Sequence, residues 1–237
     1  MQAIIVAGGR GERLRPITDN IPKPMVEVRG KPILEHTIDL LRENGITDLI
    51  VALCYLPNVI SDYFGNGKKY GVNIRYIFEN PNDPQGTAGA IRESKKFIFG
   101  DFVVTYADIL RKLDVSSMVR QHGSKSPMAT INVYKRIGND PKSMVIFDSH
   151  NKVTSFVERP TANDIKEEFV WSNGSFYIFS KKIFDYLNGD GPLDFGKDVF
   201  PSVIKMGRKI YAFKTEDYFL DIGTLEKLEE AKKTFIP

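Results

Sequence analysis

Near the start of the chain, Ala3-Ile4-Ile5-Val6-Ala7 leads directly into Gly8-Gly9-Arg10-Gly11-Glu12-Arg13-Leu14-Arg15-Pro16. The first five residues are apolar and predict a buried strand. Three glycines and three arginines follow within nine positions. Glycines at the carboxyl end of a strand let backbone N–H groups approach a phosphate closely, and arginines donate paired hydrogen bonds to its oxygens. The segment therefore predicts an α/β protein with an anion site at a strand end, where open sheets bind ligands.

Strand-like and helical patterns alternate through the first half of the chain. A helix is predicted over residues 32–44, because Pro32 suits its first turn and Gly45 suits its end. A second helix is predicted over residues 88–97. Further buried strands are predicted at residues 48–55, 73–78 and 102–106. This alternation predicts the doubly wound α/β class, a Rossmann-like, mostly parallel mixed sheet with helices on both faces.

The second half of the chain is less regular. We expect it to extend the same sheet and to add a small antiparallel extension over the ligand. A charged amphipathic helix is predicted at residues 224–235, packed on the surface. With no repeat and no convincing linker, residues 1–237 are expected to form one domain. The strand-like pieces are residues 128–134, 144–147, 153–157, 175–179 and 209–213.

Composition excludes several classes of protein. A formal net charge of +3, from 33 basic and 30 acidic residues, is mild and shows no clustered basic face, so nucleic-acid binding is not expected. No long apolar run predicts a membrane span. Cys54 is the only cysteine, which excludes an intrachain disulfide and suits a cytoplasmic location.

The glycine-rich segment fails two tests for common nucleotide loops. A Walker loop requires Gly-Lys-Ser/Thr at its end, which is missing here. A dinucleotide fingerprint requires a third glycine where Leu14 stands, which argues against a nicotinamide-dependent dehydrogenase. A tight turn with solvated arginines remains an alternative at this point.

The spacing of these residues carries a resemblance. Gly8-Gly9-x-Gly11-x-Arg13-Leu14-x-Pro16-x-Thr18, followed by Pro22-Lys23-Pro24-Met25, is similar to the signature of the sugar-1-phosphate nucleotidyltransferases. The resemblance implies that Arg13 grips the phosphates and that Lys23 lies at the reacting α-phosphate. It also implies that the backbone of Ala7, Gly8, Gly9 and Gly11 wraps the triphosphate. Taken alone, Lys23 would be interpreted as an exposed loop lysine.

The nucleoside is expected to contact a second stretch. Gly86-Thr87-Ala88-Gly89 opens the second predicted helix and resembles a segment with which the family contacts the nucleoside. Close packing of helix on sheet explains the same small residues equally well. Upstream, Glu79 stands where family members place a base-reading residue.

Two aspartates are implied as ligands of Mg²⁺, the expected cofactor. Asp108 follows a predicted strand, and a carboxylate there suits a hard cation. The family usually shows Asn-Gly-Asp, whereas this chain reads Tyr106-Ala107-Asp108 and keeps only the aspartate. Asp221, in Asp221-Ile222-Gly223-Thr224, resembles the second family aspartate. Alone, it would be interpreted as a turn residue.

The sugar phosphate is implied to bind in the second half. Glu158-Arg159-Pro160 resembles the family's Glu-Lys-Pro, with arginine replacing the lysine that meets the sugar phosphate. Asn173-Gly174 takes the position of a sugar-contacting segment, and a hairpin turn is the alternative interpretation. Residues 1–110 would then be mainly the nucleotide-binding half and residues 111–237 mainly the sugar-binding half.

The resemblance implies an enzyme that joins a nucleoside triphosphate to a hexose 1-phosphate and releases pyrophosphate. No general base is needed, because the second pKa of a phosphate monoester is about 6. UTP or dTTP with glucose 1-phosphate and GTP with mannose or heptose 1-phosphate both remain open. A non-catalytic regulatory subunit that binds sugar nucleotides is the alternative class. The sequence leaves the homo-oligomeric state, the pathway and the effect of Arg159 open.

Overall fold

The computed structural model describes residues 1–137, 142–161, 163–165 and 169–236, and the chain divides into two compact units. The first unit contains Met1–Pro84, Thr105–Leu113 and Asp217–Pro237. The second contains Gln85–Val104 and Asp114–Glu216. The prediction of a single domain stays a prediction. In the described part of the chain, no helix is long and apolar enough to cross a membrane.

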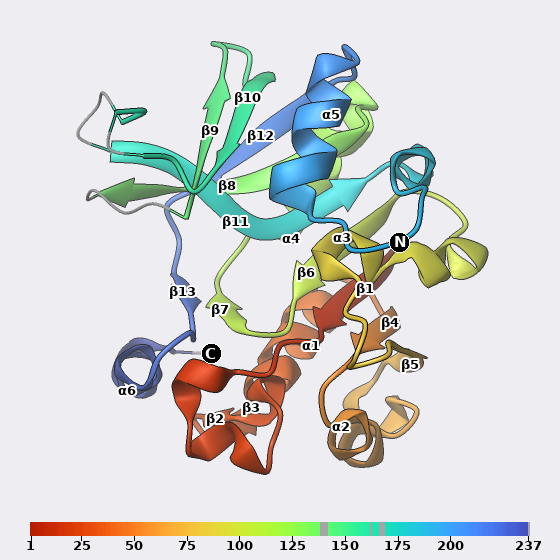
Figure 1. Ribbon diagram of the computed structural model, residues 1–237, viewed down its shortest axis with the longest axis vertical. Coiled ribbons are helices and arrows are strands. Elements are labelled where there is room, and N and C mark those ends of the chain that lie inside the picture. The colour runs from red at the N-terminus through yellow and green to blue at the C-terminus, as the bar shows by residue number, and fades with distance from the viewer. Residues whose placement is uncertain (138–141, 162, 166–168, 237) are drawn as a thin grey trace. The chain divides into compact units, whose positions relative to one another are not determined.

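Three parallel strands form the sheet of the first unit (Figure 1). They lie in the order β1 (Gln2–Ala7), β4 (Asp48–Leu53) and β5 (Asn73–Phe78). Ala7 lies opposite Leu53, and Leu53 lies opposite Phe78, so the three strands end level with one another. The residues that follow these strands therefore meet at one edge of the sheet.

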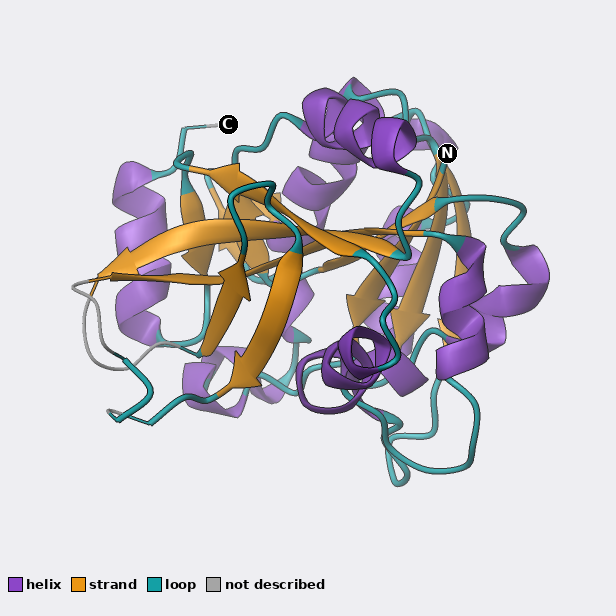
Figure 2. Ribbon diagram, turned by 90° about the horizontal axis from the view of Figure 1, so that it is seen from above, coloured by secondary structure: helices purple, strands orange, loops and turns teal. Residues whose placement is uncertain are grey.

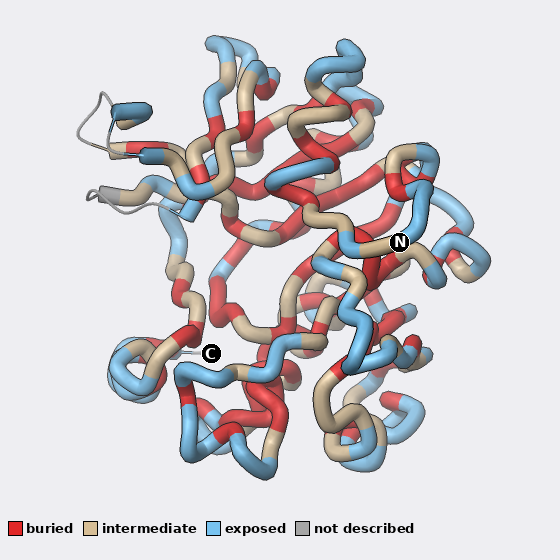
Figure 3. The backbone as a smooth tube through the Cα atoms, in the orientation of Figure 1, coloured by how far each residue is buried: buried red, intermediate tan, exposed pale blue. Residues whose placement is uncertain are grey.

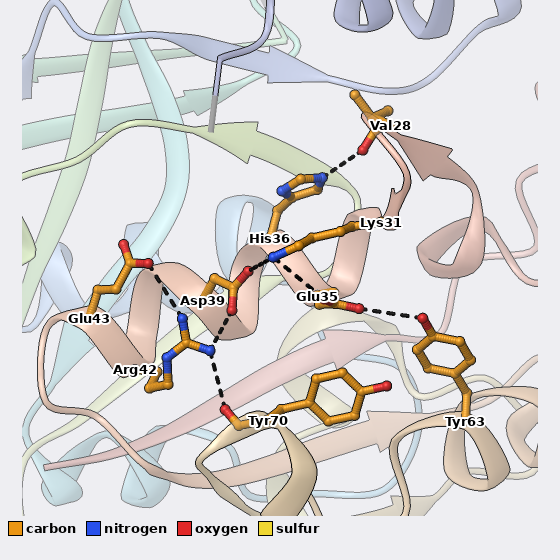
Figure 4. Close-up of polar contacts among 9 residues, drawn as sticks. All are labelled: Val28, Lys31, Glu35, His36, Asp39, Arg42, Glu43, Tyr63 and Tyr70. Carbon is orange, nitrogen blue, oxygen red and sulfur yellow. Dashed lines mark hydrogen bonds and ion pairs between the residues drawn. The ribbon is translucent and has the colours of Figure 1, made fainter.

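Helix α1 (Ile33–Glu43) has one apolar and one charged face. Its fully buried face contains Ile33, Leu34, Ile38 and Leu41. Gly45 adopts a positive φ of 73° just after its end, a conformation that favours glycine. The polar residues of the helix form a network with Lys31, Tyr63 and Tyr70 (Figure 4). Helix α2 (Pro57–Phe64) is the next helix of this unit.

Short strand pairs and a last helix build the rest of the first unit. They are β2 (Glu27–Val28) with β3 (Lys31–Pro32), β7 (Ile109–Arg111) with β13 (Phe219–Asp221), and α6 (Leu225–Thr234). Leu14, Leu110, Leu220, Ile222 and Leu228 lie together in one buried cluster. Figure 3 colours the backbone by burial and shows the buried stretches inside each unit. Because sequence neighbours of Arg13 and Asp221 belong to this cluster, the core anchors two predicted site residues.

The second unit has a mixed sheet (Figure 2). Strand β8 (Ala129–Ile137) pairs antiparallel with β11 (Phe169–Phe179) and parallel with β12 (Ile210–Thr215). Strands β9 (Ser143–Phe147) and β10 (Val153–Glu158) form an antiparallel ladder. The remaining elements are α3 (Gly86–Gly89), α4 (Val115–Lys125) and α5 (Phe200–Lys205), while β6 (Phe102–Tyr106) has residues in both units.

Tight helical turns occupy much of the connecting chain. The 3-10 turns are Glu12–Leu14, Ile17–Asp19, Lys23–Met25, Lys68–Tyr70, Arg92–Phe97 and Lys181–Tyr186. A π-helical turn, Phe195–Val199, precedes α5.

The α/β class is confirmed, and every predicted strand has a counterpart. The single helix predicted over residues 88–97 is wrong, since α3 ends at Gly89 and a separate 3-10 turn follows. Arg92 begins that turn and donates to the backbone oxygens of Leu187 and Gly191, at 2.8 and 2.7 Å. These long-range bonds, together with glycines that are poor helix formers, explain the break.

Candidate functional site

Three residues meet at the carboxyl edge of the sheet in the first unit. Gly8, Cys54 and Glu79 directly follow the three strands that end level with one another. The N–H of Glu79 donates to the backbone oxygen of Leu53 at 2.7 Å. A Cβ built on Gly8 would lie 3.2 Å from Cys54 Cβ and 3.7 Å from Glu79 Oε1. Strand register therefore brings the glycine loop and the predicted base-reading residue together.

Gly11 allows an unusual backbone conformation and also leaves room for the side chain of Lys23. Its φ is +68°, and a Cβ built on it would lie 3.0 Å from both Lys23 Cβ and Thr18 Cγ2. Thr18 Oγ1 donates to the Gly11 backbone oxygen at 2.8 Å, which ties the loop to the segment before Lys23. A side chain at Gly11 would disturb both its own backbone and the packing of Lys23.

Lys23 is a buried cation paired with two carboxylates. It begins a 3-10 turn in which the N–H of Met25 donates to the Pro22 oxygen at 2.8 Å. Its side chain is only 9% exposed. The ammonium Nζ lies 2.7 Å from Asp108 Oδ2 and 3.4 Å from Asp221 Oδ1. The alternative interpretation as an exposed loop lysine is wrong.

Asp108 and Asp221 are brought together by the ladder of β7 and β13. Asp221, the last residue of β13, lies opposite Ile109, and the N–H of Ile222 donates to the Asp108 backbone oxygen at 3.1 Å. The side chains are 36% and 24% exposed. Asp221 is thus part of a strand and not of a turn, which explains how two aspartates distant in sequence reach the same ammonium.

Two of the three arginines of the glycine-rich segment, Arg10 and Arg13, are exposed and lie beside backbone. A Cβ built on Gly223 would lie 2.9 Å from Arg13 Nη2 and 3.6 Å from Asp221 Oδ1. Arg13 is therefore close to the carboxylate pair because residue 223 lacks a side chain. Arg10 Nη2 donates to the Pro81 oxygen at 3.2 Å, which connects the loop to the segment after Glu79.

These residues line an open cavity of about 870 Å³ within the first unit. Its wall combines the glycine loop, both arginines and one of the two aspartates with a proline-rich segment. Exposed cations and backbone amides beside a cavity of this size suit a polyanionic ligand. The lining residues are Gly8, Gly9, Arg10, Gly11, Glu12, Arg13, Lys23, Cys54, Pro81, Asn82, Pro84, Asp108 and Gly223.

In the second unit, Gly86 and Thr87 begin α3 beside residues 193–195. Gly86 has a φ of +72°, and a Cβ on it would lie 2.6 Å from the Leu193 oxygen. That oxygen accepts from the N–H groups of Ala88 and Gly89, at 2.8 and 3.1 Å. Thr87 Oγ1 donates to Asp194 Oδ2 at 2.8 Å. Close packing therefore accounts for the small residues, whatever ligand binds nearby.

Glu158 lies at the end of β10 against Gly196. A Cβ built on Gly196 would lie 2.5 Å from Glu158 Oε2. Burial, with a contribution from the nearby Asp194 carboxylate, raises the pKa of Glu158, while Arg159 opposes the shift. Arg159 follows with a positive φ of 51°. The carboxylate is therefore held in a partly desolvated place in which a cationic or hydroxyl-rich ligand would relieve its charge.

Asn173 and Gly174 lie inside β11, where the ladder with β8 shifts register between Asn173 and Tyr177. The hairpin-turn alternative is therefore wrong. Asn173 Nδ2 donates to the Tyr177 hydroxyl at 2.8 Å, and its Oδ1 accepts from the N–H of Ser175 at 3.0 Å. A Cβ on Gly174 would collide with the side chain of Asn132. This bulge re-aims both residues within the strand.

The sequence assigned no role to several neighbours of the predicted site residues. Asp194 caps the π-helical turn by accepting from the N–H groups of Gly196 and Lys197 at 2.8 and 3.1 Å. The aspartate itself, a residue type favoured at N-caps, is the one local hint of this cap. The residues missed by sequence reasoning are Thr18, Cys54, Asp194, Gly196 and Gly223.

The chain resembles known proteins along nearly its whole length. Residues 2–236 match the family model described as nucleotidyl transferase. The chain is 34% identical over 236 residues to the UTP--glucose-1-phosphate uridylyltransferase of Synechocystis sp., with 94% of this chain and 60% of that protein covered. It is 31% identical over 231 residues to mannose-1-phosphate guanyltransferase 2 of Candida glabrata, with 94% and 61% covered. The chain thus spans about six tenths of the length of these relatives.

Solved structures agree with the fold. HddC from Yersinia pseudotuberculosis, in a crystal structure with GMP-PN, has a TM-score of 0.80 at 29% identity, with 99% of both chains covered. Since the family model extends over almost every residue, and the fold is shared along the entire chain, the protein belongs to the nucleotidyl transferase family.

Proposed function

We propose that the chain transfers a nucleotidyl group from a nucleoside triphosphate to a sugar 1-phosphate and releases pyrophosphate. One observation carries the proposal. A buried ammonium, Lys23 Nζ, lies between Asp108 and Asp221 at the wall of a cavity rich in glycine and arginine. Such a cluster provides fixed charge for a reaction between two phosphate groups.

Residues of the first unit would bind the triphosphate. The backbone of Gly8, Gly9 and Gly11 lines the cavity together with Arg10 and Arg13. Backbone amides and guanidinium groups donate hydrogen bonds to phosphate oxygens, and the guanidinium group keeps its positive charge at neutral pH. Glu79, beside Gly8, would contact the base.

Residues of the second unit would bind the sugar phosphate. Arg159 offers a cation for the phosphate, and Glu158 offers an acceptor for sugar hydroxyls. Burial raises the pKa of Glu158, so sugar hydroxyl groups that donate hydrogen bonds to this carboxylate would stabilise its charged form. Asn173, held by Tyr177, would add a further polar contact.

The reaction balances without an added base. A phosphate oxygen of the sugar phosphate forms a bond to the α-phosphorus, and the bond from that phosphorus to the bridging oxygen breaks. Pyrophosphate leaves with the electron pair. Because the second pKa of the phosphate monoester is about 6, the nucleophile is ionised at neutral pH. Lys23 and Arg13 would stabilise the negative charge that develops on the α-phosphoryl oxygens.

The two aspartates fit a magnesium ion. They present oxygen donors, and they already surround a cation, the Lys23 ammonium. Among the described residues, no group of three or more His, Cys, Asp or Glu side chains could hold a metal. Mg²⁺ commonly uses only one or two carboxylates together with water and substrate phosphates. Bound by Asp108 and Asp221, it would act as a Lewis acid toward the phosphates.

Two pairs of nucleotide and sugar phosphate are candidate substrates. Relatives include a protein named for UTP and glucose 1-phosphate and another named for mannose 1-phosphate and guanylyl transfer. We propose UTP or dTTP with glucose 1-phosphate, or GTP with mannose or heptose 1-phosphate, as the pairs to test. The free, buried Cys54 suits a reducing cytoplasm, which is the proposed location.

Pyrophosphate release, measured with five nucleoside triphosphates and a panel of hexose and heptose 1-phosphates, tests the activity. Lys23→Ala and Asp108→Asn should each reduce kcat by about 10²-fold or more while the fold persists. Lys31→Ala is the matched control, because Lys31 also contacts two carboxylates but lies outside the cavity. Near-normal rates in either site variant would overturn the proposal. Nucleotide binding without any pyrophosphate release would favour the regulatory-subunit alternative.

A further inference from the structure

Lys23 occupies a place suited to a metal ion. Its ammonium lies 2.7 Å from Asp108 and 3.4 Å from Asp221, and the side chain is only 9% exposed. We infer that Lys23 is a resident cation of the carboxylate pair, and that a divalent metal binds there only by displacing the lysine. This inference rests on the proposed function, which supplies the metal's role.

A second lysine shows what makes this arrangement unusual. Lys31 Nζ lies 2.7 Å from Asp39 Oδ2 and 3.5 Å from Glu35 Oε1, almost the same distances as those from Lys23 to its two aspartates. Figure 4 draws these contacts of Lys31. However, its side chain is 44% exposed, and Arg42 also pairs with Asp39 at 2.6 Å. Water therefore reaches and screens the Lys31 ammonium, whereas the Lys23 ammonium is buried beside carboxylates that are themselves partly exposed. An exchange of cations should therefore matter at Lys23 and not at Lys31.

Electrostatics makes the two cations competitors. The pair of carboxylates carries two negative charges, and Lys23 neutralises one of them at contact distance. A divalent ion placed beside the same oxygens would lie within a few ångströms of the buried ammonium and would be repelled by its charge. Metal binding should therefore be weak in the free protein and should strengthen when the ammonium moves away or is removed.

Displacement would give Lys23 a second use. The lysine lines the phosphate cavity, and its Cβ packs against Gly11 of the phosphate-binding loop. An ammonium released from the aspartates remains attached at that wall, where phosphate oxygens of a bound nucleotide would pair with it. Binding of the metal to the carboxylates would thus make the Lys23 ammonium available to the phosphates. Both the metal and the ammonium would remain in the site.

Direct binding of Mn²⁺, followed by electron paramagnetic resonance of the free ion without nucleotide, tests this inference. Lys23→Met keeps the aliphatic contact with Gly11 but removes the charge. It should bind Mn²⁺ at least about tenfold more tightly than the unmodified protein. Lys23→Arg, which keeps the charge, should bind as weakly as the unmodified protein. Lys23→Gln serves as the neutral variant if Lys23→Met does not fold.

Matched variants separate this exchange from a general loss of charge. Lys31→Met removes the same charge from the same unit and should leave Mn²⁺ affinity unchanged. Adding Asp221→Asn to Lys23→Met should abolish the gain. Equal or weaker Mn²⁺ binding in the neutral Lys23 variants would overturn the inference. Pyrophosphate release by the unmodified protein reports separately on the proposed function, so the two failures are distinguishable.

Discussion

Gly223 faces the guanidinium of Arg13 so closely that a Cβ built on the glycine would lie 2.9 Å from Nη2. This contact joins the start of the chain to the segment that supplies Asp221. The absence of a side chain at residue 223 therefore decides where the Arg13 guanidinium can lie.

Gly223→Ala should displace Arg13 and weaken triphosphate binding. We expect KM for the nucleotide to rise about tenfold, because small misplacements of a binding group are costly, with little change in thermal stability. Steady-state kinetics would measure this. Gly100→Ala is the matched control, since a Cβ there meets nothing within 4 Å. An unchanged nucleotide KM in Gly223→Ala would show that Arg13 tolerates the displacement.

Gly196→Ala should act on the sugar phosphate instead. Its Cβ would lie 2.5 Å from Glu158 Oε2, so the carboxylate must move. KM for the sugar phosphate should rise about tenfold, while KM for the nucleotide stays the same. Gly123→Ala, at another position where a Cβ meets nothing within 4 Å, is the control. Equal changes in both KM values would point to a general structural defect.

Glu158→Gln should stabilise the fold at neutral pH. Because burial raises the pKa of Glu158 above 4.5, the native state keeps this proton to higher pH than the unfolded chain. Stability is therefore lost as pH rises through the window from 4.5 to the raised value. At pH 7 the variant should melt about 1–3 °C higher, and the difference should vanish in acid, below that window.

Calorimetry over a series of pH values measures this difference. Glu216→Gln, at an exposed position of the same unit, is the control and should show no such pH dependence. A lower melting temperature for Glu158→Gln at pH 7 would contradict the prediction. Because Glu158 is also a proposed ligand of the sugar, the more stable variant should be the poorer enzyme.

Asp194 and Thr87 should be energetically coupled. Asp194→Ala removes a cap from the π-helical turn and should destabilise the protein by about 1–2 kcal/mol. Thr87→Val removes the partner that donates to Asp194 Oδ2 at 2.8 Å. Chemical denaturation of both single variants and the double variant would measure the coupling. Strictly additive losses would show that the hydrogen bond contributes nothing of its own.

Local pattern predicted the elements that depend on neighbours in sequence. The apolar run of β1 and the caps of α1 were sufficient, because burial and end signals lie within each segment. The break after Gly89 was not predictable, since it depends on bonds from Arg92 to residues about a hundred positions away. Helix α2 escaped notice because its N-cap, Leu56, adopts an unusual positive φ of 44°.

The candidate site shows the same division. The resemblance identified Lys23, Asp108 and Asp221. Their contacts depend on the pairing of β7 with β13, which the local sequence does not predict. Gly196 and Gly223 escaped prediction for a related reason. Each glycine matters because a side chain distant in sequence, Glu158 or Arg13, lies against it. The sequence around a glycine does not indicate whether such a side chain is near.

The first unit is assembled from three separate segments of the chain, Met1–Pro84, Thr105–Leu113 and Asp217–Pro237. Each segment contributes to the cluster around Lys23. A chimera between two relatives with a single crossover in the middle of the gene would therefore combine Lys23 from one parent with Asp221 from the other. Exchanging the proposed sugar-phosphate site by recombination would require transplanting the second unit as two inserts, so that one parent supplies all three charged residues.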